Sequence, residues 1–152
     1  MKKLKSLVVL LTNFIICVAA GHGAGPIILI ELFSIKTLLF EGEIAFNGGD
    51  FPTFSFNNSY ENMIIYFVVF SFFGQVFFLT SYFKFLKLKL KTVFRFIGII
   101  SMAFGFFLIS KNIFNDGLAV FSFITGIPFL CFLIIEIKDF FVENSKHHHI
   151  NL

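Results

Sequence analysis

The chain has 152 residues, of which 57% are hydrophobic, 20% are aromatic and only 14% carry a charge. Soluble domains have about 25% charged residues, so this chain has too few charges to cover a surface in water. These numbers exclude a water-soluble fold, and the length leaves no room for a catalytic domain beside four membrane spans of about 20 residues each. We therefore expect an all-α integral membrane protein with a single transmembrane domain over residues 1–152.

The first expected span is a helix over residues 6–25, which lies in a stretch without Lys, Arg, Asp or Glu. It follows three lysines within the first five residues. The same pattern resembles a secretory signal peptide that is cleaved after Ala20, and cleavage would leave three spans. We favour a retained helix because the apolar run resumes at residues 26–32.

Residues 31–61 form the expected outer loop, which is the only sizeable segment outside the membrane. Residues 47–50 read Asn-Gly-Gly-Asp, a strong turn sequence. Phe54 and Phe56 follow it and alternate with polar residues, as in a strand. We expect a short loop or hairpin here that caps the outer face of the bundle.

Three further spans are expected at residues 62–83, 93–111 and 117–136, each built on a charge-free stretch. The third span is long enough only if the guanidinium of Arg95 reaches the lipid headgroups. Between the second and third spans lies an expected basic loop over residues 84–95, in which lysines are interleaved with Leu and Phe. The sequence therefore predicts an antiparallel four-helix transmembrane bundle.

Lysine and arginine are distributed unevenly along the chain. Ten of the twelve fall in the N-terminal segment, the basic loop and the C-terminal tail, and only Lys36 and Lys111 fall in the other connections. Cytoplasmic connections are rich in Lys and Arg, so we expect both termini in the cytoplasm and the protein in a bacterial cytoplasmic (inner) membrane. The expected partners are the lipid bilayer and its anionic lipids, with no nucleic acid. The side chains expected to contact anionic lipids are Lys84, Lys87, Lys89, Lys91 and Arg95.

Small and polar residues recur at helical spacing on each expected span. Membrane helices associate through such residues, because small side chains let backbones approach and polar groups form hydrogen bonds across the contact. Asn13 and Cys17 share one face of the first span, and Ser71 and Gln75 share one face of the second. The other expected packing residues are Gly21, Gly74, Gly98, Ser101, Gly105 and Gly126.

The most unusual run in the chain reads Gly-His-Gly-Ala-Gly-Pro at residues 21–26. Its glycines and its proline favour a break in the helix near the outer interface. An ionisable group in a membrane span is a functional hypothesis by default, and His22, Glu31 and Asp116 are all expected on the outer side. We therefore predict an outer polar site for a cation or a proton, which requires the break to bring His22 and Glu31 together.

Nothing else in the sequence has the pattern of a catalytic or metal site. The three histidines at residues 147–149 are expected in a solvated tail. We expect no enzyme activity, no metal and no cofactor. The preferred interpretation is a non-enzymatic accessory or scaffold subunit that packs against itself or another membrane protein. The alternative is a small oligomeric transporter or channel that uses the outer site around His22 and Glu31.

Overall fold

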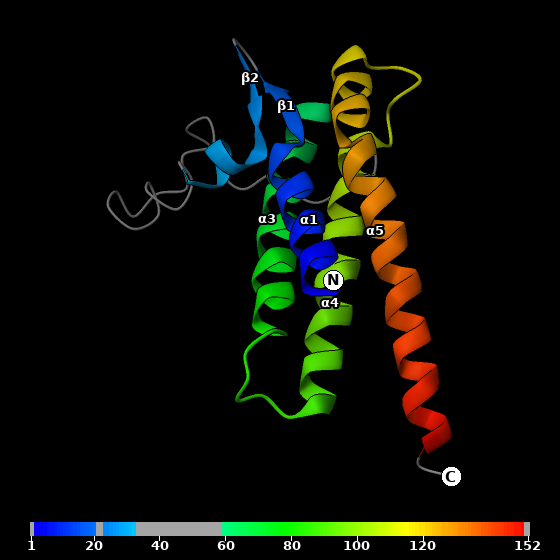
Figure 1. The fold of residues 1–152 in the computed structure, drawn as a ribbon. Helices are drawn as coiled ribbons and strands as arrows, with labels where there is room; N and C mark the ends of the chain where they lie inside the picture. The colour runs from blue at the N-terminus through cyan, green and yellow to red at the C-terminus, as the bar shows by residue number, and fades with distance from the viewer. Residues whose placement is uncertain (1, 21–22, 33–58, 151–152) are drawn as a thin grey trace.

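The structure is a computed structural model that describes residues 2–20, 23–32 and 59–150, and these residues are mostly helical (Figure 1). Three helices are long and apolar enough to cross a membrane, at Asn62–Thr80, Leu88–Ser110 and Gly117–Glu143. The prediction of a helical membrane protein is confirmed to this extent. The outer hairpin expected near residues 47–56 lies outside the described residues, as do Gly21 and His22.

The N-terminal segment differs from the expected helix over residues 6–25. Helix α1 covers only Lys2–Ile15. The chain then forms strand β1, Cys17–Ala20, which pairs antiparallel with strand β2, Gly23–Pro26. Cys17 lies opposite Pro26 in this register. The first expected span is therefore corrected to a short helix followed by a β-hairpin.

The composition of this segment explains why the helix stops. Ile15, Ile16 and Val18 are β-branched and favour extended backbone, and each later glycine costs about 1 kcal/mol in a helix relative to alanine. The hairpin instead pairs the backbone within the chain, as an apolar environment requires. The amide of Ile27 donates to the carbonyl of Ile16 at 2.8 Å. Residues 27–32 then form a short helix that follows β2 (Figure 1).

The long helices alternate in direction along the chain (Figure 1). They are α3, Tyr60–Thr80, α4, Leu88–Ser110, and α5, Gly117–Ile150. The connection at residues 81–87 lies at one end of the bundle, which we call the basic end because it carries Lys84 and Lys87. The β-hairpin and the connection at residues 111–116 lie at the opposite end, the hairpin end. Helix α1 begins partway along the bundle and runs toward the hairpin end.

Two helix ends differ from the hydropathy limits. Helix α4 begins at Leu88 instead of residue 93, and α5 continues to Ile150 instead of ending at residue 136. Hydropathy marks where charges begin, but a helix continues through charged residues that find water or an oppositely charged partner. Lys138 is exposed, and Arg95 is paired within the bundle.

Helices α3 and α4 form the most extensive helix contact in the bundle. A Cβ atom at Gly98 would lie 2.7 Å from the backbone nitrogen of Phe78 and 2.8 Å from the carbonyl oxygen of Gly74. A Cβ atom at Gly74 would lie 2.6 Å from Cγ of Met102. The two backbones therefore touch directly, which only glycine permits at these positions.

The remaining small residues contact larger partners. A Cβ atom at Gly105 would lie 3.3 Å from the ring of Phe67, and Gly126 faces the ring of Phe106 so closely that a Cβ atom would collide with it. Ser101 is half-buried. The close contacts thus extend from the α3–α4 pair to α5.

Candidate functional site

One face of α1 carries polar side chains into the bundle. Ser6 and Asn13 are seven residues apart, which is nearly two helical turns, so both project from the same side. Their exposed fractions are 3% and 0%. Buried polar groups need hydrogen-bond partners, and each of these two residues lies in a separate polar cluster.

The central cluster consists of Asn13, Glu31, Ser71 and Gln75. Ser71 and Gln75 lie one turn apart on α3, and both donate hydrogen bonds to Oδ1 of Asn13, at 2.5 and 2.7 Å. Nε2 of Gln75 also lies 3.0 Å from Oε1 of Glu31. Three separate segments of the chain therefore meet at Gln75.

The carboxyl group of Glu31 is enclosed by this cluster. Glu31 is 4% exposed and belongs to the short helix at residues 27–32, outside the three long apolar helices. Burial raises the pKa of Glu31 from its usual 4.5 to about 7, although hydrogen bonds from Gln75 and Ser71 lower it. The neighbouring polar groups are neutral amides and a hydroxyl. The carboxyl group can therefore gain or lose a proton near neutral pH.

Asn13 adds a second feature to the central cluster. Its Nδ2 atom is buried and has no hydrogen-bond partner among the described residues. An unsatisfied buried donor costs about 1–3 kcal/mol. The cluster thus offers a carboxyl group that exchanges a proton and an amide that can still donate a hydrogen bond.

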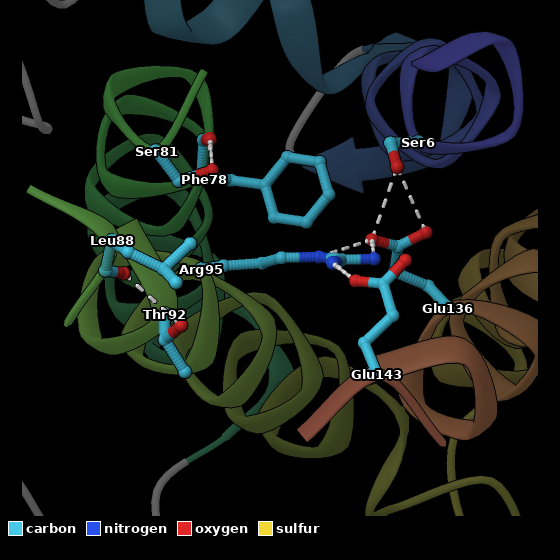
Figure 2. A network of polar contacts seen from close by, with 8 residues as sticks. All are labelled: Ser6, Phe78, Ser81, Leu88, Thr92, Arg95, Glu136 and Glu143. Atoms are coloured by element: carbon cyan, nitrogen blue, oxygen red, sulfur yellow. Dashed lines mark hydrogen bonds and ion pairs between the residues drawn. The ribbon is translucent and has the colours of Figure 1, made fainter. Parts of the chain in front are cut away.

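The basic-end cluster consists of Ser6, Arg95, Glu136 and Glu143 (Figure 2). Arg95 of α4 reaches across to α5, where Nη2 lies 2.6 Å from Oε1 of Glu136 and Nη1 lies 2.5 Å from Oε2 of Glu143. The hydroxyl of Ser6 lies 3.1 and 3.0 Å from the two carboxylate oxygens of Glu136. This cluster ties α1, α4 and α5 together.

The position of Arg95 corrects the expectation that it reaches the lipid headgroups. Its side chain is 17% exposed, and its guanidinium lies 5.8 Å from the ring centre of Phe140 as well as beside the two glutamates. Glu136 and Glu143 are seven residues apart and therefore share a face of α5. An internal partner is stronger than a distant headgroup, because the carboxylates are already held in place.

Side chains of α3 and α5 also hold the hairpin. The amide of Cys17 donates to Oγ1 of Thr125 at 3.1 Å, and the amide of Ala19 donates to the hydroxyl of Tyr60 at 3.2 Å. That hydroxyl lies 2.5 Å from Oγ of Ser122. These bonds satisfy the free edge of β1, which would otherwise expose backbone amides.

The structure separates the residues of the predicted outer site. Glu31 points into the central cluster, while the carboxylate of Asp116 accepts a hydrogen bond from the amide of Leu118 at 2.8 Å and so caps α5. The expected site placed both on the outer side because it assumed that the chain leaves the bundle after the first span. The hairpin reverses the chain and returns Glu31 to the interior. His22 lies outside the described residues.

Sequence reasoning had identified Asn13, Ser71 and Gln75 as packing residues and had not grouped them with Glu31. It also missed the basic-end cluster. The available signal was the seven-residue spacing of Glu136 and Glu143 together with an arginine inside an apolar stretch. In the described part of the chain, no group of three His, Cys, Asp or Glu side chains is placed to hold a metal ion.

Comparison of the chain with protein-family models, with curated proteins and with solved structures finds no match.

Proposed function

We propose that the protein is a small multi-pass membrane protein that binds a proton at Glu31, in the class of proton-coupled carriers or channels. The observation that carries this proposal is the buried carboxyl group of Glu31 beside Gln75, in a cluster completed by Asn13 and Ser71. Ionisable groups inside membrane proteins are costly and usually serve a pathway for ions or protons. The proposed site therefore lies inside the bundle and not at the outer face, and Glu31 is the residue that it shares with the site expected from the sequence.

The chemistry of the central cluster suits reversible protonation. The charged carboxylate accepts a hydrogen bond from Gln75, and the neutral acid can also donate one. Loss of the proton leaves a charge among neutral groups, which favours any rearrangement that brings water or a cation to the carboxylate. Protonation at Glu31 is therefore coupled to contacts between α1, α3 and residues 27–32.

The arrangement favours a carrier over an open pore. Ser6 and Asn13 are separated by about 10 Å along α1, and the buried apolar side chains Val9 and Leu10 lie between them. The polar groups of the two clusters are therefore not continuous along α1. A proton or cation would cross only when the helices rearrange.

Flux into proteoliposomes tests this proposal. We expect purified protein to collapse an imposed pH gradient faster than empty liposomes do. Glu31→Gln keeps the shape of the side chain but cannot ionise, and it should reduce the protein-dependent rate at least about tenfold. Asp116→Asn is the matched control, because asparagine also caps a helix, and it should retain the rate.

Two results would contradict the proposal. One is the absence of flux of protons, Na⁺ and K⁺ by the wild-type protein at every pH from about 5 to about 9. The other is equal flux through the wild-type protein and the Glu31→Gln variant. Elution volume and thermal unfolding would show that each variant is folded.

An accessory or scaffold subunit is the second candidate. Two observations favour it. The polar side chains of α1 form contacts within the chain. One side of α5 is apolar and exposed, and it includes Ile124, Ile127 and Ile134. Such a subunit should co-purify with a second copy or with another membrane protein in mild detergent. A protein that stays monomeric and alone under these conditions would count against this candidate.

We propose that the basic end faces the cytoplasm of a bacterium, with the protein in the cytoplasmic membrane. The excess of Lys and Arg in the segments at this end supports that orientation. Helix α1, about 21 Å long, and the hairpin, about 13 Å long, together match a hydrocarbon core of about 30 Å. The N-terminal segment would then be the fourth crossing, in a form that is only partly helical.

A further inference from the structure

An apolar groove lies where α1 and α3 meet near the basic end. It has a volume of about 220 Å³ and is lined by Leu7, Leu10, Leu79 and Tyr82. The floor is Leu10, which is 3% exposed, and the rims are Leu7 and Leu79, which are 48% and 47% exposed. The groove exists because α1 begins partway along the bundle and leaves the last turn of α3 uncovered (Figure 1).

Lysines follow the groove residue Tyr82 closely in the chain. The chain continues from Tyr82 into residues 83–91, which hold four lysines and no acidic residue. Lys84, Lys87 and Lys89 are exposed. Arg95 is not part of this charge, because Glu136 and Glu143 neutralise it inside the bundle. The exposed positive charge that follows the groove in the chain is therefore that of these lysines.

The lining of the groove suits an acyl chain. Three of its four lining residues are leucines, and the fourth is a tyrosine. An apolar slot that ends beside lysines is complementary to an amphiphile with a negative headgroup.

We propose that this groove binds one anionic phospholipid, with an acyl chain against Leu10 and Leu79 and the phosphate near Lys84 and Lys87. The inference does not depend on proton binding at Glu31. It differs from general attraction of lysines to a charged membrane, because it requires both the slot and the charge. Removal of either one should therefore weaken binding.

The test uses the full chain in detergent micelles, with phosphatidylglycerol and phosphatidylcholine as probes. Native mass spectrometry measures the retained lipid, and thermal unfolding measures the stabilisation by each lipid. We expect about thirtyfold greater retention of phosphatidylglycerol than of phosphatidylcholine, because each of the two lysines contributes about 1 kcal/mol near an anionic headgroup and 1.4 kcal/mol corresponds to a factor of about ten. The double variant Lys84→Gln and Lys87→Gln should remove this preference.

The groove itself is tested with the lysines intact. Leu79→Trp fills the slot and should reduce retention of phosphatidylglycerol to the level of phosphatidylcholine. Leu7→Phe provides a milder second variant if the first does not fold. Leu118→Trp, at an exposed position of α5 near the hairpin end, is the matched control and should bind as the wild type does.

Three outcomes would overturn the proposal. Equal retention of the two lipids by the wild-type protein would remove the preference for an anionic headgroup. Unchanged retention in both groove variants would show that surface charge alone attracts the lipid. Loss of a dimer on substitution of Leu79 would show that a second copy of the chain occupies the groove.

Discussion

Glu31 connects the stability of the bundle to pH through a single carboxyl group. Burial raises its pKa from 4.5 to about 7, so between these values the folded state holds a proton that the unfolded state has lost. Stability from this group is fully present below about pH 4.5 and is lost as the pH rises through about 7. A shift of this size corresponds to about 3 kcal/mol.

We predict that Glu31→Gln removes this dependence. The wild-type protein should unfold at a lower temperature at about pH 8 than at about pH 5, and the variant should unfold at similar temperatures at both. Glutamine has the same length as glutamate and can still accept a hydrogen bond, but it carries no charge. The variant should therefore be more stable than the wild-type protein at the higher pH. Thermal unfolding in detergent measures this, and parallel curves for the two proteins would contradict the prediction.

The polar residues of the central cluster were only partly visible in the sequence. Asn13, Ser71 and Gln75 stand out because helical periodicity places each on a contact face. Glu31 does not belong to that pattern, since its position depends on the antiparallel pairing of β1 with β2. Residue spacing reports local structure, whereas the return of a segment into the bundle depends on contacts that are distant in sequence.

Helices α3 and α4 depend on glycine for their contact. Gly74 and Gly98 bring the two backbones together, and close packing supplies much of the attraction between helices in lipid. The apolar side chains of α3 face both lipid and protein, so this helix needs no amphipathic pattern.

We predict that Gly98→Ala destabilises the protein by about 1–3 kcal/mol, because the new methyl group must push the backbone of Phe78 away. Gly117→Ala is the matched control, since a Cβ atom there would meet nothing within 4 Å. The control should leave the thermal unfolding midpoint unchanged or slightly raised. Equal midpoints for Gly98→Ala and the control would argue against direct backbone contact.

Hydropathy located the three long helices and misjudged the N-terminal element. A window of apolar residues has the same hydropathy in a helix and in a strand, so residues 17–20 were expected to continue the helix. The glycines at residues 21–25 and Pro26 were the signal for a break. The helix ends several residues before them, at Ile15, because pairing with β2 begins at Cys17.

The bundle as a whole has opposite ends of different charge character. The basic end carries the exposed lysines of residues 84–89, while the hairpin end carries the connection at residues 111–116. Chain orientation in a membrane follows the lysines and arginines of short connections. One labelled position at each end of the bundle is therefore enough to test the orientation.

We predict that a cysteine at position 87 is labelled by an impermeant maleimide only in inverted vesicles, and a cysteine at position 115 only in intact spheroplasts. The variants are Lys87→Cys and Asn115→Cys, made in a chain in which Cys17 and Cys131 are serine. Both wild-type residues are exposed, so labelling reports the side of the membrane and not burial. The reverse pattern would invert the proposed orientation.

The polar face of α1 has a consequence for biosynthesis. Ser6 and Glu136 lie 130 residues apart in sequence, and Asn13 and Ser71 lie 58 residues apart. Helix α1 leaves the ribosome before α3 and α5, so its polar groups lack their partners until α5 is made. Incomplete chains would carry that polar helix openly in the bilayer.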